Sequence, residues 1–304
     1  MNSNKYKKDK KSFGKSDFQR GSEKGGFKRK NSGSFGDERP PKRRSFSDRQ
    51  AEEHPSEELS NGAVPGRNAV RELLKSGRDI EKIFVREGDR EGSITVLVAT
   101  AIERGIPVIE TDKKKLDALC GYEQHQGIVA IASEMEYVSL EDVIAIAQER
   151  GEKPLIVICD GISDPHNLGA IIRCAEGAGA HGIILPKRRA AGITPAVVKA
   201  SAGATEHLAA VKCSNISDTI RKLKDLGFWI FAAEADGTDY TKADYDCPCA
   251  IVLGSEENGV SDIVKKNSDF TVSIPMKGKV NSLNVSTAAA VLLYEAIKQR
   301  DCNI

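Results

Sequence analysis

The sequence contains no uninterrupted apolar stretch of about 18 residues, which a membrane-spanning helix requires, so we expect no membrane segment. It also lacks the charged and then apolar opening of a secretory signal peptide, because residues 1–11 (MNSNKYKKDKK) are mostly polar and basic. Closely spaced cysteines are scarce as well, since only Cys247 and Cys249 among the seven lie near each other. This usage predicts buried structural thiols, no metal site and a cytoplasmic protein.

Two common nucleotide-binding motifs give no support for a nucleotidase or a dehydrogenase. The P-loop pattern G-x-x-x-x-G-K-[ST] does not occur. Gly177, Gly179 and Gly182 fit G-x-G-x-x-G, but they follow an expected helix and precede an expected strand. A dinucleotide fingerprint needs the opposite order, so we expect no nicotinamide or flavin site there.

Basic residues are unevenly distributed, although the formal net charge of the 304 residues is only +1. Residues 1–50 hold 16 Lys and Arg against 6 Asp and Glu, whereas the rest of the chain holds 29 against 38. The basic segment has almost no Val, Ile or Leu and cannot bury enough apolar surface to fold. We therefore expect residues 1–60 to form a disordered arm. Its interleaved aromatic and basic side chains favour contact with RNA, and a solubilising tail is the alternative.

Apolar patterning predicts two α/β domains after this arm. Residues 61–133 begin with a helix over 66–75 and then alternate between strand and helix, and residues 134–153 form a charged, partly helical linker. Residues 154–304 contain short apolar strands between helices, which is typical of a parallel sheet covered on both faces. The strands expected in this larger domain are 155–159, 182–185, 208–211, 229–233, 250–253 and 270–274, and the expected helices are 168–177, 195–202, 216–226, 261–266 and 285–300.

Polar side chains gather after three of these strands, within residues 160–180, 251–260 and 274–296. Each segment alone could serve only as a turn and a helix cap. Together they favour a binding site, because open α/β sheets bind ligands at the carboxyl ends of their strands. Asp160, Asp164 and His166 also imitate a magnesium or catalytic cluster, although a turn that caps a helix is the simpler interpretation. The polar residues at the three strand ends include Asn167, Arg173, Glu256, Ser282 and Asn284.

These three segments resemble the three signature motifs of the SpoU, or TrmH-type, RNA ribose 2′-O-methyltransferases of the SPOUT class. The resemblance covers about residues 154–304. Residues 62–132 resemble the L30e-like RNA-binding domain that precedes this domain in some members. The two-domain arrangement is closest to the RlmB group, the bacterial 23S rRNA guanosine-2′-O-methyltransferases. The matching residues are Asn167-x-Gly169 with Arg173, Gly254-x-Glu256-x-x-Gly259, and Ser282-Leu283-Asn284-Val285-Ser286.

The resemblance implies a C-terminal SPOUT domain with a parallel sheet and a trefoil knot. It implies S-adenosylmethionine as the cofactor, bound largely by backbone groups at positions that match Gly254, Ile274 and Leu283, with Met276 nearby. A glycine at position 254 would let the backbone approach this ligand closely. A homodimer, and RNA rather than DNA or a membrane as the partner, are implied in the same way. Arg67 and Asn68, and Lys187 and Arg188 in the basic patch 187–189, are candidate RNA contacts.

By position, Arg173 matches the family's catalytic arginine, and Asn167, Glu256, Ser282 and Asn284 would orient it and the ribose. A guanidinium has a pKa of roughly 12.5–13.8, which argues against a general base. We therefore expect Arg173 to bind the adjacent phosphate and stabilise the developing alkoxide. The expected reaction is methylation of a guanosine ribose in the peptidyl-transferase loop of 23S rRNA. The alternatives are a tRNA or another rRNA target, and a catalytically silent assembly factor that binds rRNA.

Overall fold

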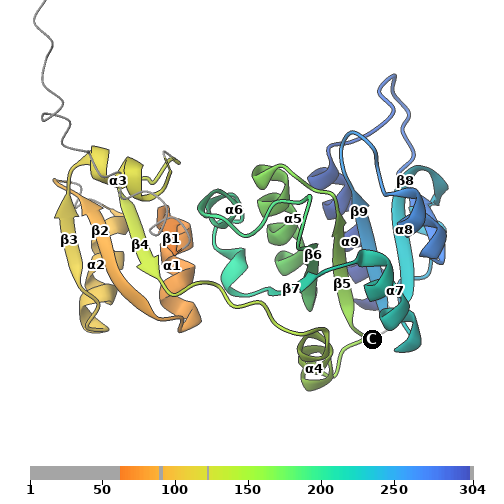
Figure 1. Ribbon diagram of the computed structural model, residues 1–304, viewed down its shortest axis with the longest axis horizontal. Coiled ribbons are helices and arrows are strands. Elements are labelled where there is room, and N and C mark those ends of the chain that lie inside the picture. Colours follow the sequence, from red (N-terminus) through yellow and green to blue (C-terminus); the bar gives the residue numbers. More distant parts are fainter. Residues whose placement is uncertain (1–61, 89–91, 122, 302–304) are drawn as a thin grey trace, which may run out of the picture. The chain divides into compact units, whose positions relative to one another are not determined.

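The computed structural model describes residues 62–88, 92–121 and 123–301, and Figure 1 shows their helices and strands. The basic arm expected at residues 1–60 lies outside the described residues. Two β-sheets, each with its own helices, make up most of the described part. Within these ranges no helix is long and apolar enough to cross a membrane.

The first sheet is mixed and has the strand order β1-β4-β2-β3. Strands β4 and β2 pair antiparallel, β1 joins β4 antiparallel, and β3 joins β2 in parallel. The sequence pattern did not indicate β1, because three residues are too few to show an alternation. The elements are β1 (Ala63–Pro65), α1 (Arg67–Ser76), β2 (Ile80–Arg86), α2 (Ser93–Glu103), β3 (Val108–Thr111), α3 (Lys113–Leu119) and β4 (Ile128–Ala132).

Alternating side chains of β2 explain why helices cover both faces of this sheet. Ile83 and Val85 belong to the core that α1 and α2 complete, whereas Phe84 belongs to a second core with Leu116 and Leu119 of α3. A strand with apolar residues on both faces must be covered on both, and here α1 and α2 cover one face while α3 covers the other.

Helix α4 (Leu140–Arg150) follows the first sheet and begins at a capping box. The Ser139 hydroxyl accepts the Asp142 N–H, and the Asp142 carboxylate accepts the Ser139 N–H. Leu140 and Val143 of this helix are buried against the larger sheet. The expected linker thus contains a helix that belongs to the core of the second sheet.

The second sheet has six strands, all parallel, in the order β10-β8-β9-β5-β6-β7. This confirms the expected parallel α/β architecture of the larger domain. Its elements are β5 (Leu155–Asp160), α5 (Pro165–Gly177), β6 (Gly182–Pro186), α6 (Pro195–Ala200), β7 (Ala209–Cys213), α7 (Ile216–Asp225), β8 (Trp229–Asp239), β9 (Cys249–Gly254), α8 (Asp262–Asn267), β10 (Phe270–Ser273) and α9 (Val285–Asp301).

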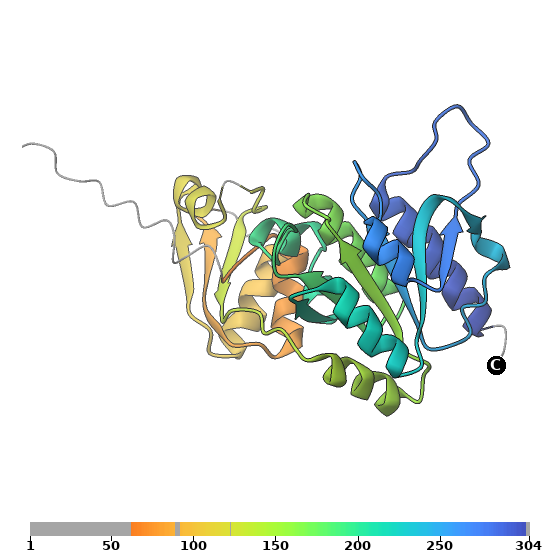
Figure 2. The same ribbon diagram turned by 45° about the vertical axis from the view of Figure 1, so that its right-hand side comes forward.

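Helices cover both faces of this sheet (Figure 2). One face packs on α5 and α9 through residues such as Leu168 and Leu292, and the other packs on α4, α7 and α8 through residues such as Ile220 and Val264. Strand β5 is buried on both sides, since Val157 lies in the first core and Ile158 in the second. Its continuous apolar run is therefore explained by its place inside the sheet.

The strand order reverses direction beside β5. The chain runs from β5 to β6 and β7 on one side and later places β9 on the other side of β5. The connection leaving β5 leads to α5 on one face, whereas the connection leaving β9 leads to α8 on the opposite face. Two diverging connections leave a crevice at the strand ends, and open α/β sheets bind ligands at such a point.

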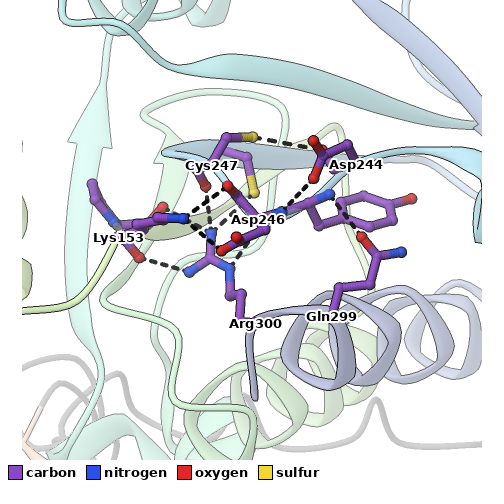
Figure 3. A network of polar contacts seen from close by, with 9 residues as sticks. Lys153, Asp244, Asp246, Cys247, Gln299 and Arg300 are labelled. Atoms are coloured by element: carbon purple, nitrogen blue, oxygen red, sulfur yellow. Dashed lines mark hydrogen bonds and ion pairs between the residues drawn. The ribbon is translucent and has the colours of Figure 1, made fainter. Parts of the chain in front are cut away.

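Arg300, near the end of α9, binds backbone groups at the amino-terminal edge of the sheet, which is the edge opposite the crevice (Figure 3). Its guanidinium donates hydrogen bonds to the backbone carbonyls of Lys153 at 2.6 Å, Pro154 at 3.2 Å, Tyr245 at 3.1 Å and Cys247 at 2.7 Å. One side chain thus binds the segments that lead into β5 and β9.

Helix α5 and strand β8 exceed their expected bounds by the most. Helix α5 begins at Pro165 because Asp164 caps it, accepting two backbone N–H groups of the first turn. Strand β8 continues to Asp239 because its last residues pair with Val272 and Ser273 beyond a break in register. The interpretation of Asp164 as a helix cap is therefore confirmed.

Candidate active site

A cavity of about 590 Å³ opens beside the middle of β8 and at the carboxyl ends of β9 and β10. This volume lies within the usual range of ligand pockets, roughly 300–1,000 Å³. Its lining comes from the middle of β8, the turn after β9, the segment after β10 and the start of α9. The four positions expected to hold the cofactor, Gly254, Ile274, Met276 and Leu283, all line this cavity. Their role as cofactor ligands stays a prediction.

Gly254 is needed for the fold of the β9 turn itself. A Cβ at this position would lie 2.0 Å from the carbonyl carbon of Gly259 and 2.1 Å from the nitrogen of Val260. The turn folds back this tightly because Ser255 and Gly259 exchange two backbone hydrogen bonds, of 3.0 and 2.8 Å. A side chain at position 254 would therefore collide with the returning loop. The sequence had suggested a different reason for this glycine, namely close approach of the backbone to a ligand.

Glu234 is a cavity residue that the sequence analysis missed. One carboxylate oxygen accepts the Val260 N–H at 2.6 Å, and Lys265 lies 3.6 Å from the other oxygen. The side chain is 17% exposed, and its hydrogen bond to Val260 ties the middle of β8 to the β9 turn. The same criterion that selected the other strand ends could have found it, since Glu234 directly follows the expected strand 229–233.

Asn167, Glu256 and Asn284 form a polar cluster at the rim of the cavity. The Asn284 side-chain N–H₂ donates to the side-chain oxygen of Asn167 at 3.0 Å and to a carboxylate oxygen of Glu256 at 3.1 Å. The Asn167 N–H₂ donates to the same carboxylate oxygen. The structure thus brings together one residue from each of the three polar segments.

The start of α9 fixes the orientation of Asn284. Its side-chain oxygen accepts the backbone N–H of Ser286 at 2.9 Å and the Ser286 hydroxyl at 2.6 Å, which is the behaviour of a helix cap. Its N–H₂ group therefore points away from α9, toward Glu256. Ser282 lines the cavity two residues earlier. Asn284 thus both caps the helix and lines the cavity.

Arg173 stands apart from this cluster. Its side chain is exposed on α5, six residues beyond Asn167, and it is not among the residues that line the cavity. It forms no hydrogen bond or ion pair with any residue in the described ranges. Asn167, Glu256, Ser282 and Asn284 were expected to orient it, and in the described structure none of them forms a hydrogen bond with it. Its catalytic role stays a prediction.

The candidate RNA contacts lie elsewhere. Arg67 lines a cavity of about 520 Å³ in the first α/β unit, where its Nε donates to the Gln126 carbonyl at 3.0 Å. Asn68 accepts a hydrogen bond from Arg71 at 2.9 Å. Lys187 and Arg188 are exposed on the loop after β6. Their contact with RNA stays a prediction.

Other reactive groups near the site have structural roles. The Asp160 carboxylate accepts the backbone N–H and the hydroxyl of Ser261, at 2.8 and 2.6 Å. Burial raises the pKa of the Cys159 thiol to about 12, which makes it a poor nucleophile. Among the described residues, no group of three or more His, Cys, Asp and Glu side chains could hold a metal ion.

Comparisons with known proteins identify the family of this chain. The SpoU rRNA Methylase family model matches residues 154–294, and the model for RNA 2′-O ribose methyltransferase substrate binding matches residues 63–138. A putative TrmH family tRNA/rRNA methyltransferase of Bacillus subtilis, YacO, is 41% identical over 239 residues, which are 78% of this chain and 96% of that protein. The chain belongs to the SpoU/TrmH family of RNA methyltransferases.

Two solved structures of similar proteins contain the methyl donor. The SpoU methyltransferase AviRb from Streptomyces viridochromogenes, in complex with AdoMet, has a TM-score of 0.65 and 27% identity over 79% of this chain and 90% of that one. An AdoMet-bound rRNA methyltransferase from Sinorhizobium meliloti has a TM-score of 0.64 and 28% identity, over 78% and 86%. S-adenosylmethionine is thus the cofactor of this SpoU/TrmH protein.

The cavity residues of this family member fit that cofactor. Leu253, Val272 and Leu292 provide apolar walls for an adenosine, while backbone groups of the β9 turn and the Glu234 carboxylate provide polar ones. A ligand that combines charged groups with a flat aromatic base needs both kinds of wall.

Proposed function

We propose that this protein transfers the methyl group of S-adenosylmethionine to the ribose 2′-oxygen of a guanosine in 23S rRNA. The cluster of Asn167, Glu256 and Asn284 is the observation that carries the proposal, because it lies at the rim of the cavity that suits the cofactor. The match of residues 63–138 to the substrate-binding model of RNA 2′-O ribose methyltransferases supports ribose as the acceptor.

The bound cofactor supplies an electrophilic methyl group on a sulfonium. The task of the protein is to orient a weakly acidic hydroxyl and to stabilise the negative charge that develops on its oxygen. The carboxylate of Glu256 and the amides of Asn167 and Asn284 hold one another in place, so they can orient the hydroxyl without rearranging. We assign Arg173 to bind the adjacent phosphate and stabilise the alkoxide, with the proton leaving to phosphate or water.

The proposal includes the assembly that the family resemblance implies: a cytoplasmic homodimer with a knotted SPOUT domain and an L30e-like domain that grips RNA. Light scattering on the purified full chain should give about twice the monomer mass of 32.9 kDa. A monomer that remains active would contradict the dimer and leave the methyl-transfer proposal intact.

The decisive experiment combines the purified protein, tritiated cofactor and total RNA from a strain that lacks this protein. We expect label in large-subunit rRNA, and mapping should find one 2′-O-methylated guanosine that is missing in the deletion strain. Label in tRNA would favour the second candidate, which the names of relatives such as YacO support. Label on a base, or no label at all, would contradict ribose methylation, and the absence of label would favour the assembly factor.

A further inference from the structure

A second cavity, of about 320 Å³, adjoins the cofactor cavity. The two cavities share part of their lining, and Glu256 of the polar cluster belongs to both. The second cavity is also lined by residues 161–164 after β5 and by residues 255–258 after β9. It therefore lies at the point where the connections from β5 and β9 diverge, which is the preferred ligand position in such sheets.

Arg189 is the cationic residue among the described residues that line this second cavity. It stands on the loop after β6, which is held at both ends: the Lys187 N–H donates to the Cys213 carbonyl at 2.9 Å, and the Ala191 N–H donates to the Ile162 carbonyl at 2.8 Å. These bonds fix the loop beside the turn after β5. Lys187 and Arg188 share the loop but do not line the cavity.

The backbone and side chain of Arg189 are both unusual. Its φ of 60° is in the left-handed region that favours glycine. Strained non-glycine residues of this kind cluster at functional sites. Its exposed guanidinium forms no hydrogen bond or ion pair with any residue in the described ranges. Hydrogen bonds on either side of Arg189 thus hold its backbone in place, while its guanidinium has no partner among the described residues and is available to a ligand.

The other charges of the cavity restrict the kind of ligand. Asp164, Glu256 and Glu257 also line it, so a bare anion would face three carboxylates and one guanidinium. A nucleotide suits this arrangement better, because it combines an anionic phosphate with hydroxyl and N–H donors that carboxylates accept.

We infer that the second cavity receives the nucleotide that accepts the methyl group, and that Arg189 binds one of its phosphates. This inference rests on the proposed function. The cofactor and the acceptor then lie on either side of Glu256, which places the acceptor hydroxyl within reach of the polar cluster. Arg189 acts in substrate binding and is separate from Arg173, which is assigned to the reacting centre.

Arg189→Gly is the sharpest test, because glycine keeps the left-handed backbone and removes only the side chain. With total RNA from the deletion strain as the probe, kcat/KM should fall about 10–100-fold, as expected for the loss of a charged hydrogen bond. The affinity for S-adenosylmethionine, measured by calorimetry, should stay within about twofold, since no contact to the first cavity is lost. Arg189→Lys should recover part of the activity, because it restores the charge without the planar fork.

Arg188→Ala provides the matched comparison, since it removes the same charge from the same loop outside the cavity. We expect Arg189→Gly to lose much more activity than Arg188→Ala. Equal losses would mean that the loop acts as a general electrostatic surface, and wild-type kcat/KM in Arg189→Gly would mean that the acceptor binds elsewhere; either result overturns the inference. A wild-type protein that methylates no RNA would overturn the proposed function, and this inference with it.

Discussion

The side-chain amide of Asn284 donates a hydrogen bond to the side-chain oxygen of Asn167 at 3.0 Å, although the two residues are 117 positions apart. The bond joins the first turn of α5 to the start of α9. Both amides also donate to Glu256, on the turn after β9. Three connections that leave the sheet separately are thus joined by a single carboxylate and two carboxamides.

Asn284→Asp should therefore impair catalysis strongly. The substitution keeps the shape of the side chain and its helix-capping oxygen, but it replaces the N–H₂ donor with an oxygen that repels Glu256. We expect turnover to fall by about 10²–10³-fold, the typical loss when one preorganised polar group of an active site is removed. The turnover is measured as the transfer of tritium from the labelled cofactor to RNA.

Asn215→Asp is the matched control, because Asn215 caps α7 and aspartate caps helices equally well. It adds the same charge away from the cluster and should leave turnover unchanged. Normal turnover in Asn284→Asp would show that the cluster has only a structural role.

Arg173→Ala should nearly abolish turnover while cofactor affinity stays close to normal. The side chain lies outside the cofactor cavity, so its loss removes no cofactor contact. Removal of a group that stabilises the developing alkoxide should cost about 10²–10³-fold in rate. Single-turnover methyl transfer, together with calorimetric titration of S-adenosylmethionine, separates the two effects. Arg221→Ala, on the surface of α7, controls for the loss of one exposed positive charge.

The pairing of Asn167 with Asn284 also shows what the sequence could predict. Continuous apolar runs such as residues 155–159 and 250–253 predicted a parallel sheet, and strand ends of such a sheet lie at one edge. This was sufficient to gather Asn167, Glu256 and Asn284 at one site. The order of the strands was not predictable, because it depends on contacts between segments far apart in the chain.

Local backbone geometry explains the features that the sequence did not predict. Strand β8 was expected to end at residue 233 rather than at Asp239, because it continues beyond a break in register that only the pairing with β10 reveals. Gly169 carries a motif position, but its role is packing: a Cβ there would lie 2.5 Å from the Ala200 Cβ of α6. The left-handed backbone of Arg189 is set by hydrogen bonds to two other segments, which no pattern in the sequence shows.

Arg300→Ala should destabilise the larger domain without changing the chemistry. Four backbone carbonyls at the amino-terminal edge of the sheet lose their hydrogen-bond donor, and water replaces that donor only partly (Figure 3). We expect the free energy of unfolding to fall by about 2–3 kcal/mol, a typical value for charged hydrogen bonds that are partly buried. Urea titration followed by fluorescence of the single tryptophan, Trp229, measures the change.

Lys298→Ala is the control for that measurement, since Lys298 is exposed and pairs with Glu295 on the same helix. Its effect should stay below about 0.5 kcal/mol. A loss in Arg300→Ala no larger than in Lys298→Ala would contradict the role given to Arg300.

His181 should make the stability of the protein depend on pH below neutrality. Burial lowers the pKa of its imidazole below the ordinary value of 6.5, and the hydrogen bond to Glu152 only partly opposes this effect. Its Nδ1 accepts the Leu155 N–H at 3.0 Å, and its Nε2 lies 2.9 Å from a Glu152 carboxylate oxygen. A proton on Nδ1 would break the bond to Leu155, so the native state holds the neutral form.

The sign of the pH dependence follows from proton binding. As the pH falls below about 6.5, the unfolded chain binds a proton at His181 before the native protein does, so the free energy of unfolding decreases. The slope reaches at most about 1.4 kcal/mol per pH unit and flattens below the native pKa. Urea titrations between pH 7.5 and about 5 should show this decrease in the wild type and a smaller one in His181→Gln. In Glu152→Gln the imidazole loses the carboxylate that supports its charge, so the decrease should extend to lower pH. Identical pH profiles for the wild type and His181→Gln would show that His181 titrates alike in the folded and unfolded states.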